Sequence, residues 1–125
     1  MKDDNTFEIE YKYDFKHDVL AIKVKRDYVY GRTIEMEEGV LLDLDDDNVP
    51  VAFEMLDVSK RFNLPKYSLR NLVCFNLGVR ITLESIMVNL RLGVFVRNRE
   101  LSECVDYLTS NLDNLPVLET ELVTA

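Results

Sequence analysis

The stretch VCFNLGVRITLESIMVNLRLGVFV, residues 73–96, decides the fold of this chain. Apolar side chains occupy every odd position from 73 to 83 and every even position from 86 to 96. Alternation with a period of two is typical of strands with one buried face. A turn at Glu84–Ser85 pairs residue 83 with 86, 81 with 88 and 73 with 96, so that apolar residues meet apolar partners. The stretch therefore predicts a long antiparallel hairpin.

A second turn, at Asn98–Arg99, would make residues 100–107 a third strand, with Leu101 facing Val96. A helix competes for this segment, because its apolar residues also fit a period of 3.6. Two cross-strand charge pairs favour the strand. These pairs are Arg97 with Glu100 and Arg91 with Asp106.

The two cysteines, Cys74 and Cys104, lie on the strands that flank the central strand of this register, beside Phe95 and Gly93. Two strand spacings amount to about 9.5 Å, which exceeds the reach of a disulfide. We therefore predict free thiols. Neither cysteine has a histidine nearby in the sequence to activate it, so inert packing is the expected role.

Residues 1–62 also alternate, and they predict an antiparallel meander of about five strands. The last two strands close on the acidic turn Asp45–Asn48, which pairs Leu44 with Val49 and Val40 with Phe53. The five strands are expected at residues 7–13, 20–24, 28–36, 40–44 and 49–55.

A short helix and a second meander follow. Asp57 is placed to cap a helix over VSKRF, which Pro65 would stop. Residues 63–125 are expected to form the second antiparallel meander, with a final edge strand near 117–123, packed with the first half as one unit. The predicted fold class is mainly β, with α+β as the alternative.

The segment DLDDDNVPVAFE, residues 43–54, nearly spells the ligand pattern of a calcium loop. An EF-hand loop needs a helix on each side, whereas the alternation here predicts strands. In the hairpin Asp43 would lie opposite Pro50, and Glu54 would lie about 13 Å from that rung, too far to share an ion. We predict a solvated turn and no metal centre. The candidates for a weakly bound cation are Asp45, Asp46 and Asp47.

The segments YKYDFKHDVLAIKV and EEGVLLDLDDDNVPVAFEMLDVSK carry several linked motifs. With them, residues 8–62 resemble the domain of unknown function family 2283. The resemblance implies no catalytic or ligand residue, since the family defines none. Small members of the family are often encoded beside small toxin-like proteins, which implies a partner-binding role. The matching motifs are Tyr13-Asp14, Gly39 to Asp43, Asp45 to Asn48, and Leu56 to Ser59, with Val58 in place of the usual alanine and Asn48 in place of glycine.

The family pattern picks out four aspartates, Asp14, Asp18, Asp43 and Asp57. As a cluster they would be a ligand or metal site. Taken singly, aspartate side chains bond nearby backbone amides, so that they form turns and cap helices. We expect the second role.

Charge is segregated along the chain, whose net charge is −8. Residues 1–57 carry 7 basic and 16 acidic side chains, residues 58–99 carry 8 basic and one acidic, and residues 100–125 carry six acidic and none basic. A basic face for nucleic acid would use Arg80, Arg91 and Arg97. The flanking acids would repel phosphate, so we do not expect nucleic-acid binding.

The chain has 125 residues, a single histidine (His17), four scattered glycines and no apolar run of membrane-spanning length. No catalytic constellation is visible, so we expect no enzyme, no cofactor and no membrane partner. The start MKDDNTFEIE lacks a secretion core, which predicts a cytoplasmic protein. The leading hypothesis is a protein-binding or structural module that acts through its own copy, as a homodimer, or through a basic partner in the manner of an antitoxin. The alternative is a domain that binds a small ligand or a divalent cation.

Overall fold

Residues 6–124, which the computed structural model describes, form nine strands and two short helices. No helix in this range is long and apolar enough to cross a membrane. In chain order the elements are β1 (Thr6–Asp14), β2 (Val19–Val24), β3 (Tyr30–Glu37), β4 (Val40–Asp45), β5 (Pro50–Leu56), α1 (Val58–Phe62), the 3-10 helix η1 (Lys66–Arg70), β6 (Cys74–Ile81), β7 (Ser85–Val96), β8 (Arg99–Ser110) and β9 (Leu118–Val123).

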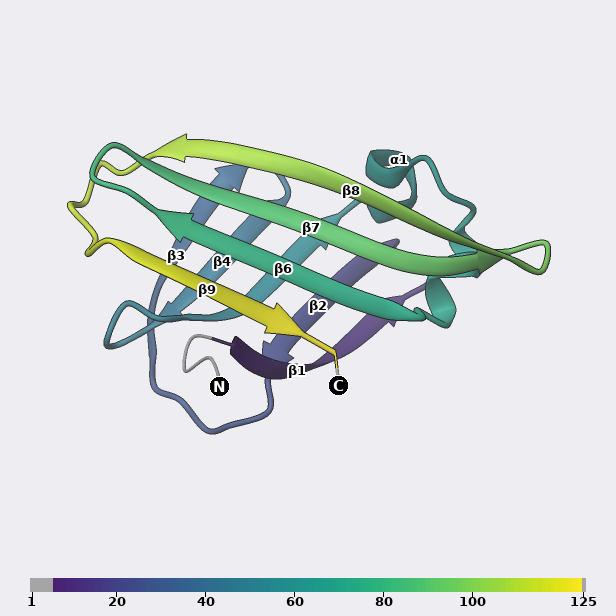
Figure 1. Ribbon diagram of the computed structural model, residues 1–125, viewed down its shortest axis with the longest axis horizontal. Coiled ribbons are helices and arrows are strands. Elements are labelled where there is room, and N and C mark those ends of the chain that lie inside the picture. The colour runs from purple at the N-terminus through teal and green to yellow at the C-terminus, as the bar shows by residue number, and fades with distance from the viewer. Residues whose placement is uncertain (1–5, 125) are drawn as a thin grey trace.

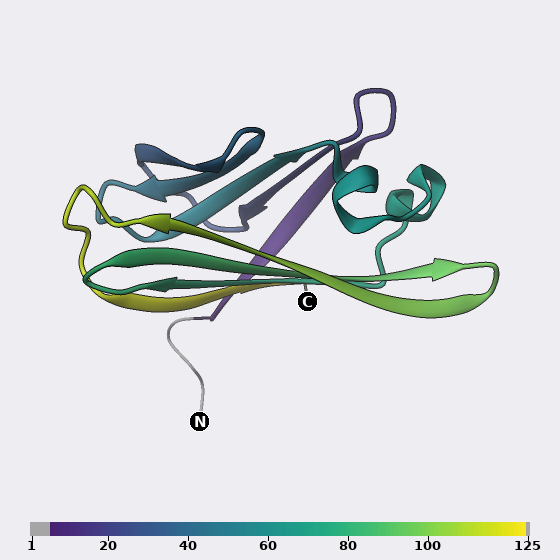
Figure 2. The same cartoon turned by 90° about the horizontal axis from the view of Figure 1, so that it is seen from above.

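The strands form one sheet with the order β3-β4-β5-β2-β1-β9-β6-β7-β8. The sheet curls, so that the first half-sheet (β1–β5) and the second half-sheet (β6–β9) face each other as two layers (Figures 1 and 2). β1 pairs with β9 in parallel, and the other neighbours pair antiparallel. The prediction of a mainly β, mostly antiparallel fold with a short helix after the fifth strand is confirmed.

The sheet order departs in two places from the order of the strands along the chain. β2 pairs with β5 instead of β3, so the first half-sheet is not a strict meander. β9, expected at an edge, lies between β1 and β6. In that position Thr120 and Leu122 are buried, and both sides of β9 find hydrogen-bonding partners. The sheet edges are β3 and β8.

The core lies between the two layers, where alternate side chains of each strand point inward. Leu42 and Phe53 contribute from the first half-sheet, and Leu77 and Leu90 contribute from the second, each with at most 2% of its surface exposed. The alternating pattern gives each half-sheet one apolar face, and burial of these two faces against each other is the main source of stability.

The three predicted hairpins exist, but their registers differ from the expected ones. The shift is two residues in the β6–β7 and β7–β8 hairpins and along most of β4–β5, where a bulge between Asp43 and Leu44 leaves Leu44 opposite Pro50 instead of Val49. Ile86 pairs with Ile81 instead of residue 83, and Leu101 pairs with Val94 instead of Val96. Val40 pairs with Met55 instead of Phe53. A shift by an even number keeps every side chain on the expected face, because side chains alternate with a period of two.

Turn chemistry explains the shifts of the β7–β8 and β6–β7 hairpins. Arg97 and Asn98 both have positive φ, which makes them the central pair of a tight hairpin turn, so the turn is not at Asn98–Arg99. At the β6–β7 turn, the hydroxyl of Thr82 accepts hydrogen bonds from the N–H groups of Glu84 and Ser85. The side chain of Thr82 therefore fixes a turn that is centred one residue earlier than expected.

Residues 99–110 form a strand, so the strand interpretation is confirmed over the helix. The expected charge pairs are wrong, since Arg91 faces Cys104 and Glu100 faces Phe95. Cys74 faces Gly93. Both thiols are free, as predicted, but both are exposed, so the expected packing role is wrong.

The helix α1 forms over the predicted residues, but its cap comes from elsewhere in the chain. Asp57 has a left-handed backbone and makes no side-chain cap bond. Instead the buried carboxylate of Asp18, in the β1–β2 turn, accepts the backbone N–H of Ser59 at 3.1 Å and the Ser59 hydroxyl at 2.7 Å. It also accepts the hydroxyl of Tyr13 at 2.6 Å. Burial and this hydrogen bond raise the pKa of Tyr13.

Arg61 of α1 ties together the two edges of the sheet. Its guanidinium donates to Glu37 and to the carbonyl of Leu56, both at 2.7 Å, and to the hydroxyl of Tyr107 on β8 at 3.3 Å. Burial alone would lower the pKa of Arg61, but the hydrogen bonds with Tyr107 and Glu37 outweigh burial and raise it. Gly39 has φ +84°, and a Cβ there would lie 2.9 Å from the guanidinium, so glycine fits where other residues would not.

We expect Asp18→Asn to lower the free energy of unfolding by about 1–3 kcal/mol, because an amide replaces an accepting oxygen and leaves a buried donor unpaired. Urea denaturation measures this change. Asp57→Asn is the matched control, since the same substitution there removes no side-chain cap bond. Its effect should stay within about 0.5 kcal/mol. Equal losses for the two variants would show that Asp18 is not the cap.

Candidate functional site

The acidic turn between β4 and β5 is organised by one of its own carboxylates. Asp45 is buried, and its Oδ1 accepts hydrogen bonds from the backbone N–H groups of Asp47 and Val49, each at 2.9 Å. Its Oδ2 lies 3.3 Å from the guanidinium of Arg26. Carboxylate oxygens of Asp45, Asp46 and Asp47 lie within 4.8 Å of one another. The oxygens of Asp45 are nevertheless already engaged by donors of the chain.

The two ends of the calcium-like pattern lie apart from this turn. Asp43 faces Ala52, not Pro50 as expected. Glu54 lies two residues further along β5, or about 7 Å from the Asp43 rung. Asp43 instead accepts a hydrogen bond from the hydroxyl of Thr33 at 2.7 Å. The structure therefore does not bring Asp43 and Glu54 together with the turn carboxylates.

The four aspartates of the family pattern do not form one cluster. Asp14 accepts the backbone N–H of His17 at 3.1 Å and contacts the His17 ring at 2.8 Å. These two interactions hold the pKa of the Asp14 carboxyl below its usual value. Asp14 thus forms a turn and Asp18 caps a helix, while Asp57 contributes through its backbone conformation.

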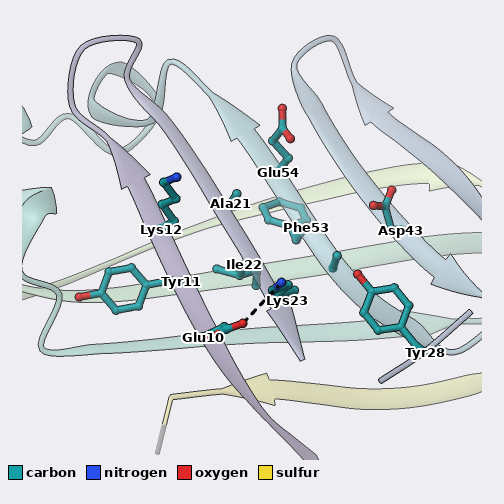
Figure 3. A pocket seen from close by; sticks show the side chains of 11 residues that line it. Glu10, Tyr11, Lys12, Ala21, Ile22, Lys23, Tyr28, Asp43, Phe53 and Glu54 are labelled. Carbon is teal, nitrogen blue, oxygen red and sulfur yellow. Dashed lines mark ion pairs between the residues drawn. The ribbon is translucent and has the colours of Figure 1, made fainter. Parts of the chain in front are cut away.

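Small residues hollow the outer face of the first half-sheet. Ala21 of β2 and Ala52 of β5 occupy its centre, where neighbouring outward positions carry long polar side chains. The resulting alanine groove has a volume of about 560 Å³ and is bounded by Lys12, Asp43 and Tyr28 (Figure 3). This volume falls in the range of ligand-binding clefts.

Charges of opposite sign flank the alanine groove. The ladder places Lys12 opposite Ala21 and Ala21 opposite Glu54, so a cation and an anion face each other across a small residue. In the next row Glu10 and Lys23 form an ion pair at 3.6 Å (Figure 3). The groove is therefore apolar at its floor and charged at its sides.

A second groove lies on the outer face of the second half-sheet, over Gly78 of β6. This glycine groove has a volume of about 730 Å³, and its sides include Asp106, Glu119 and Glu121. Arg80 pairs with Glu119 at 2.7 Å. The glycine groove thus carries more acids than bases.

Large apolar side chains are exposed at the end of the second half-sheet that adjoins the glycine groove. Met87 and Leu108 are cross-strand neighbours and line the groove. Leu83, Leu112 and Val117 lie in the loops beyond these strands and are 81%, 85% and 64% exposed. We call these five residues the apolar end, which lies at the left in Figure 1.

The loop that carries Leu112 is fixed by hydrogen bonds of a buried asparagine, Asn111. The buried side chain of Asn111 donates to the carbonyls of Thr82 at 2.9 Å and Leu115 at 3.0 Å, and it accepts the N–H of Leu115 at 2.9 Å. The backbone N–H of Asn111 donates to the carbonyl of Glu84 at 3.0 Å. Leu112 is therefore displayed to solvent by a loop with fixed geometry.

Residues 10–59 match the family described as "Protein of unknown function (DUF2283)". The chain belongs to this family. It is 33% identical over 108 residues to a Methanosarcina mazei protein named "Putative hypoxanthine phosphoribosyltransferase", with 86% of each chain covered. It is 28% identical over 116 residues to an uncharacterized Methanocaldococcus jannaschii protein, with 92% of this chain and 97% of the relative covered.

No solved structure matches the chain. The resemblance to the DUF2283 family, expected over residues 8–62, is confirmed. Every residue that lines the alanine groove lies between positions 10 and 54, inside the DUF2283 match. The glycine groove, lined by residues between 78 and 121, lies outside that match.

The three arginines considered for nucleic-acid binding do not form a cluster. Arg80 faces Met87 on β7, Arg91 lies further along the same strand, and Arg97 lies in the β7–β8 turn. Ten residues of strand separate the rung of Arg80 from Arg97, which corresponds to about 33 Å. A compact phosphate site would require these side chains to be much closer together.

Sequence reasoning missed both grooves, although a pattern for them exists. Ala21, Ala52 and Gly78 occupy outward strand positions whose neighbours are charged or polar. A small residue at an outward position hollows the face of a sheet without any cost to the core. Such positions attract less notice than charged motifs, because no periodicity marks them.

Calcium should leave the melting temperature of this protein unchanged at matched ionic strength, because the oxygens of Asp45 already accept hydrogen bonds from the chain. Thermal unfolding followed by circular dichroism, in calcium chloride and in sodium chloride, checks this expectation. A calcium-dependent rise in melting temperature that disappears in Asp46→Asn would establish a cation site at the turn.

Proposed function

We propose that this DUF2283 protein is a non-enzymatic, cytoplasmic binding module that takes a basic protein partner on the glycine groove and the apolar end. The observation that carries the proposal is the continuity of these two surfaces. Met87 and Leu108 line the groove and also belong to the apolar end. A partner that covers the groove would therefore bury apolar side chains at the same time.

Exposed apolar side chains on an ordered surface favour association, because burial removes them from water. Leu108 and Leu112 are 66% and 85% exposed. Complete burial of a leucine side chain contributes about 1.5–3 kcal/mol. The loop of Leu112 is already fixed by Asn111, so binding would require little further ordering of the chain.

The charge of the glycine groove selects the class of partner. Asp106, Glu119 and Glu121 outnumber Arg80, and Arg80 is already paired with Glu119. Complementary charge steers association and excludes partners of like charge. A basic segment with an apolar anchor fits this surface, and a small basic toxin would be one such partner.

The name of the Methanosarcina relative refers to a phosphoribosyltransferase. We do not propose a transferase reaction for this chain. Phosphorylated sugars are bound by clustered positive charge or by free N–H groups at a helix N-terminus. Both grooves hold more acids than bases. At the start of α1, the N–H of Ser59 is bonded to the carboxylate of Asp18, which would repel phosphate.

We expect tagged protein, expressed in its own host, to retain a basic protein in stoichiometric amount, and Leu108→Asp to lose it. A buried aspartate at this position should weaken the complex at least about tenfold, or about 1.4 kcal/mol. Native mass spectrometry of the eluate measures both the mass and the stoichiometry.

Tyr67→Asp is the matched control. It adds the same charge at an exposed large side chain, 55% exposed, on η1 at the opposite end of the molecule (Figure 2). The control should keep the partner. Retention of the partner by Leu108→Asp, or an eluate that contains this chain alone, would refute the proposal.

A further inference from the structure

We propose that a second copy of this chain docks on the alanine groove, so that the two first half-sheets pack face to face. The alanine groove is lined from the first half-sheet and the glycine groove from the second, and these two half-sheets form separate layers (Figure 2). The proposal stands on observations independent of those that support binding of a basic partner.

The floor of the alanine groove suits close approach of a second sheet. Ala21 and Ala52 are half-buried at the centre of an outer face that no helix or strand within residues 6–124 covers (Figure 2). Sheets that pack face to face lie about 10 Å apart, and their central side chains must fit within that gap. Leu56, 41% exposed at an outward position of β5, adds apolar surface to the same face.

The charges on this face are self-complementary. Lys12 and Glu54 lie on opposite sides of Ala21, two strand spacings or about 9.6 Å apart. Within residues 6–124 neither side chain forms an ion pair. A cation and an anion at equal distances from one central strand are the arrangement that a two-fold axis requires.

A second copy rotated by 180° about an axis along β2, above Ala21, would place its Lys12 over Glu54 and its Glu54 over Lys12. One contact between unlike charges would thus be made twice. Lys23 lies near this axis, but it is already neutralised by Glu10 at 3.6 Å. Tyr28 lies on the side of the groove away from β1, so it would meet the β1 side of the second copy instead of its own equivalent (Figure 3).

Charge exchange between the two sides of the groove tests this proposal. Sedimentation equilibrium should show a dimer for the wild-type chain, and Lys12→Glu and Glu54→Lys should each weaken dimerisation at least tenfold, because each would place like charges opposite one another. An equimolar mixture of the two variants should form a heterodimer, since each then supplies the charge that the other lacks. Both substitutions lie at exposed positions, and circular dichroism would verify that the variants fold.

Leu108→Asp is the control that separates this interface from the apolar end, and it should remain dimeric. Three results would each overturn the proposal. These are a wild-type chain that stays monomeric, single variants that dimerise like the wild type, and a mixture that fails to form heterodimers.

Discussion

The position of β9 is the constraint on which the rest of the structure depends. β9 pairs in parallel with β1 over residues 6–8 and antiparallel with β6 over residues 76–81, and through it two half-sheets become one. Because the single sheet curls, the apolar faces of both halves share one core, and Arg61 ties the two outer edges together. The outer faces remain open to solvent. Both grooves lie on these faces, where a small residue removes nothing from the core.

Local periodicity predicted the inward faces of β6, β7 and β8 even where the register was wrong, but it failed at the strand ends, where Leu83 is 81% exposed, and in β9, whose buried residues are Thr120 and Leu122. The β6–β7 and β7–β8 hairpins shifted by two residues, because alternation determines only the face, while turn chemistry at Thr82 and at Arg97–Asn98 determines the register. The cap of α1 by Asp18 joins residues 41 positions apart. Neither that bond nor the central position of β9 leaves a periodic trace in the sequence. The grooves escaped notice for a similar reason, since they arise from side chains that are small.

The two outer faces offer different chemistry. The alanine groove places Lys12 and Glu54 on either side of a small floor, which suits an identical surface turned by a two-fold axis. The glycine groove is acidic and continues into the apolar end, which suits a basic partner with an apolar anchor. The DUF2283 match covers the first groove, whereas the similarity to the Methanosarcina and Methanocaldococcus proteins covers 86% and 92% of this chain. A dimer built on the first face would leave two copies of the second free, pointing away from each other.

If β9 unites the two half-sheets into one cooperative unit, a destabilising substitution in β9 must lower the stability of both half-sheets. Leu122 is fully buried, and Leu122→Ala should cost about 2–5 kcal/mol. Hydrogen exchange, measured residue by residue in this variant, is the most direct test. We expect β2 and β5 to lose protection together with β6 and β7. A loss confined to β6–β9, with β2 and β5 protected as in the wild type, would show that the two half-sheets are independent.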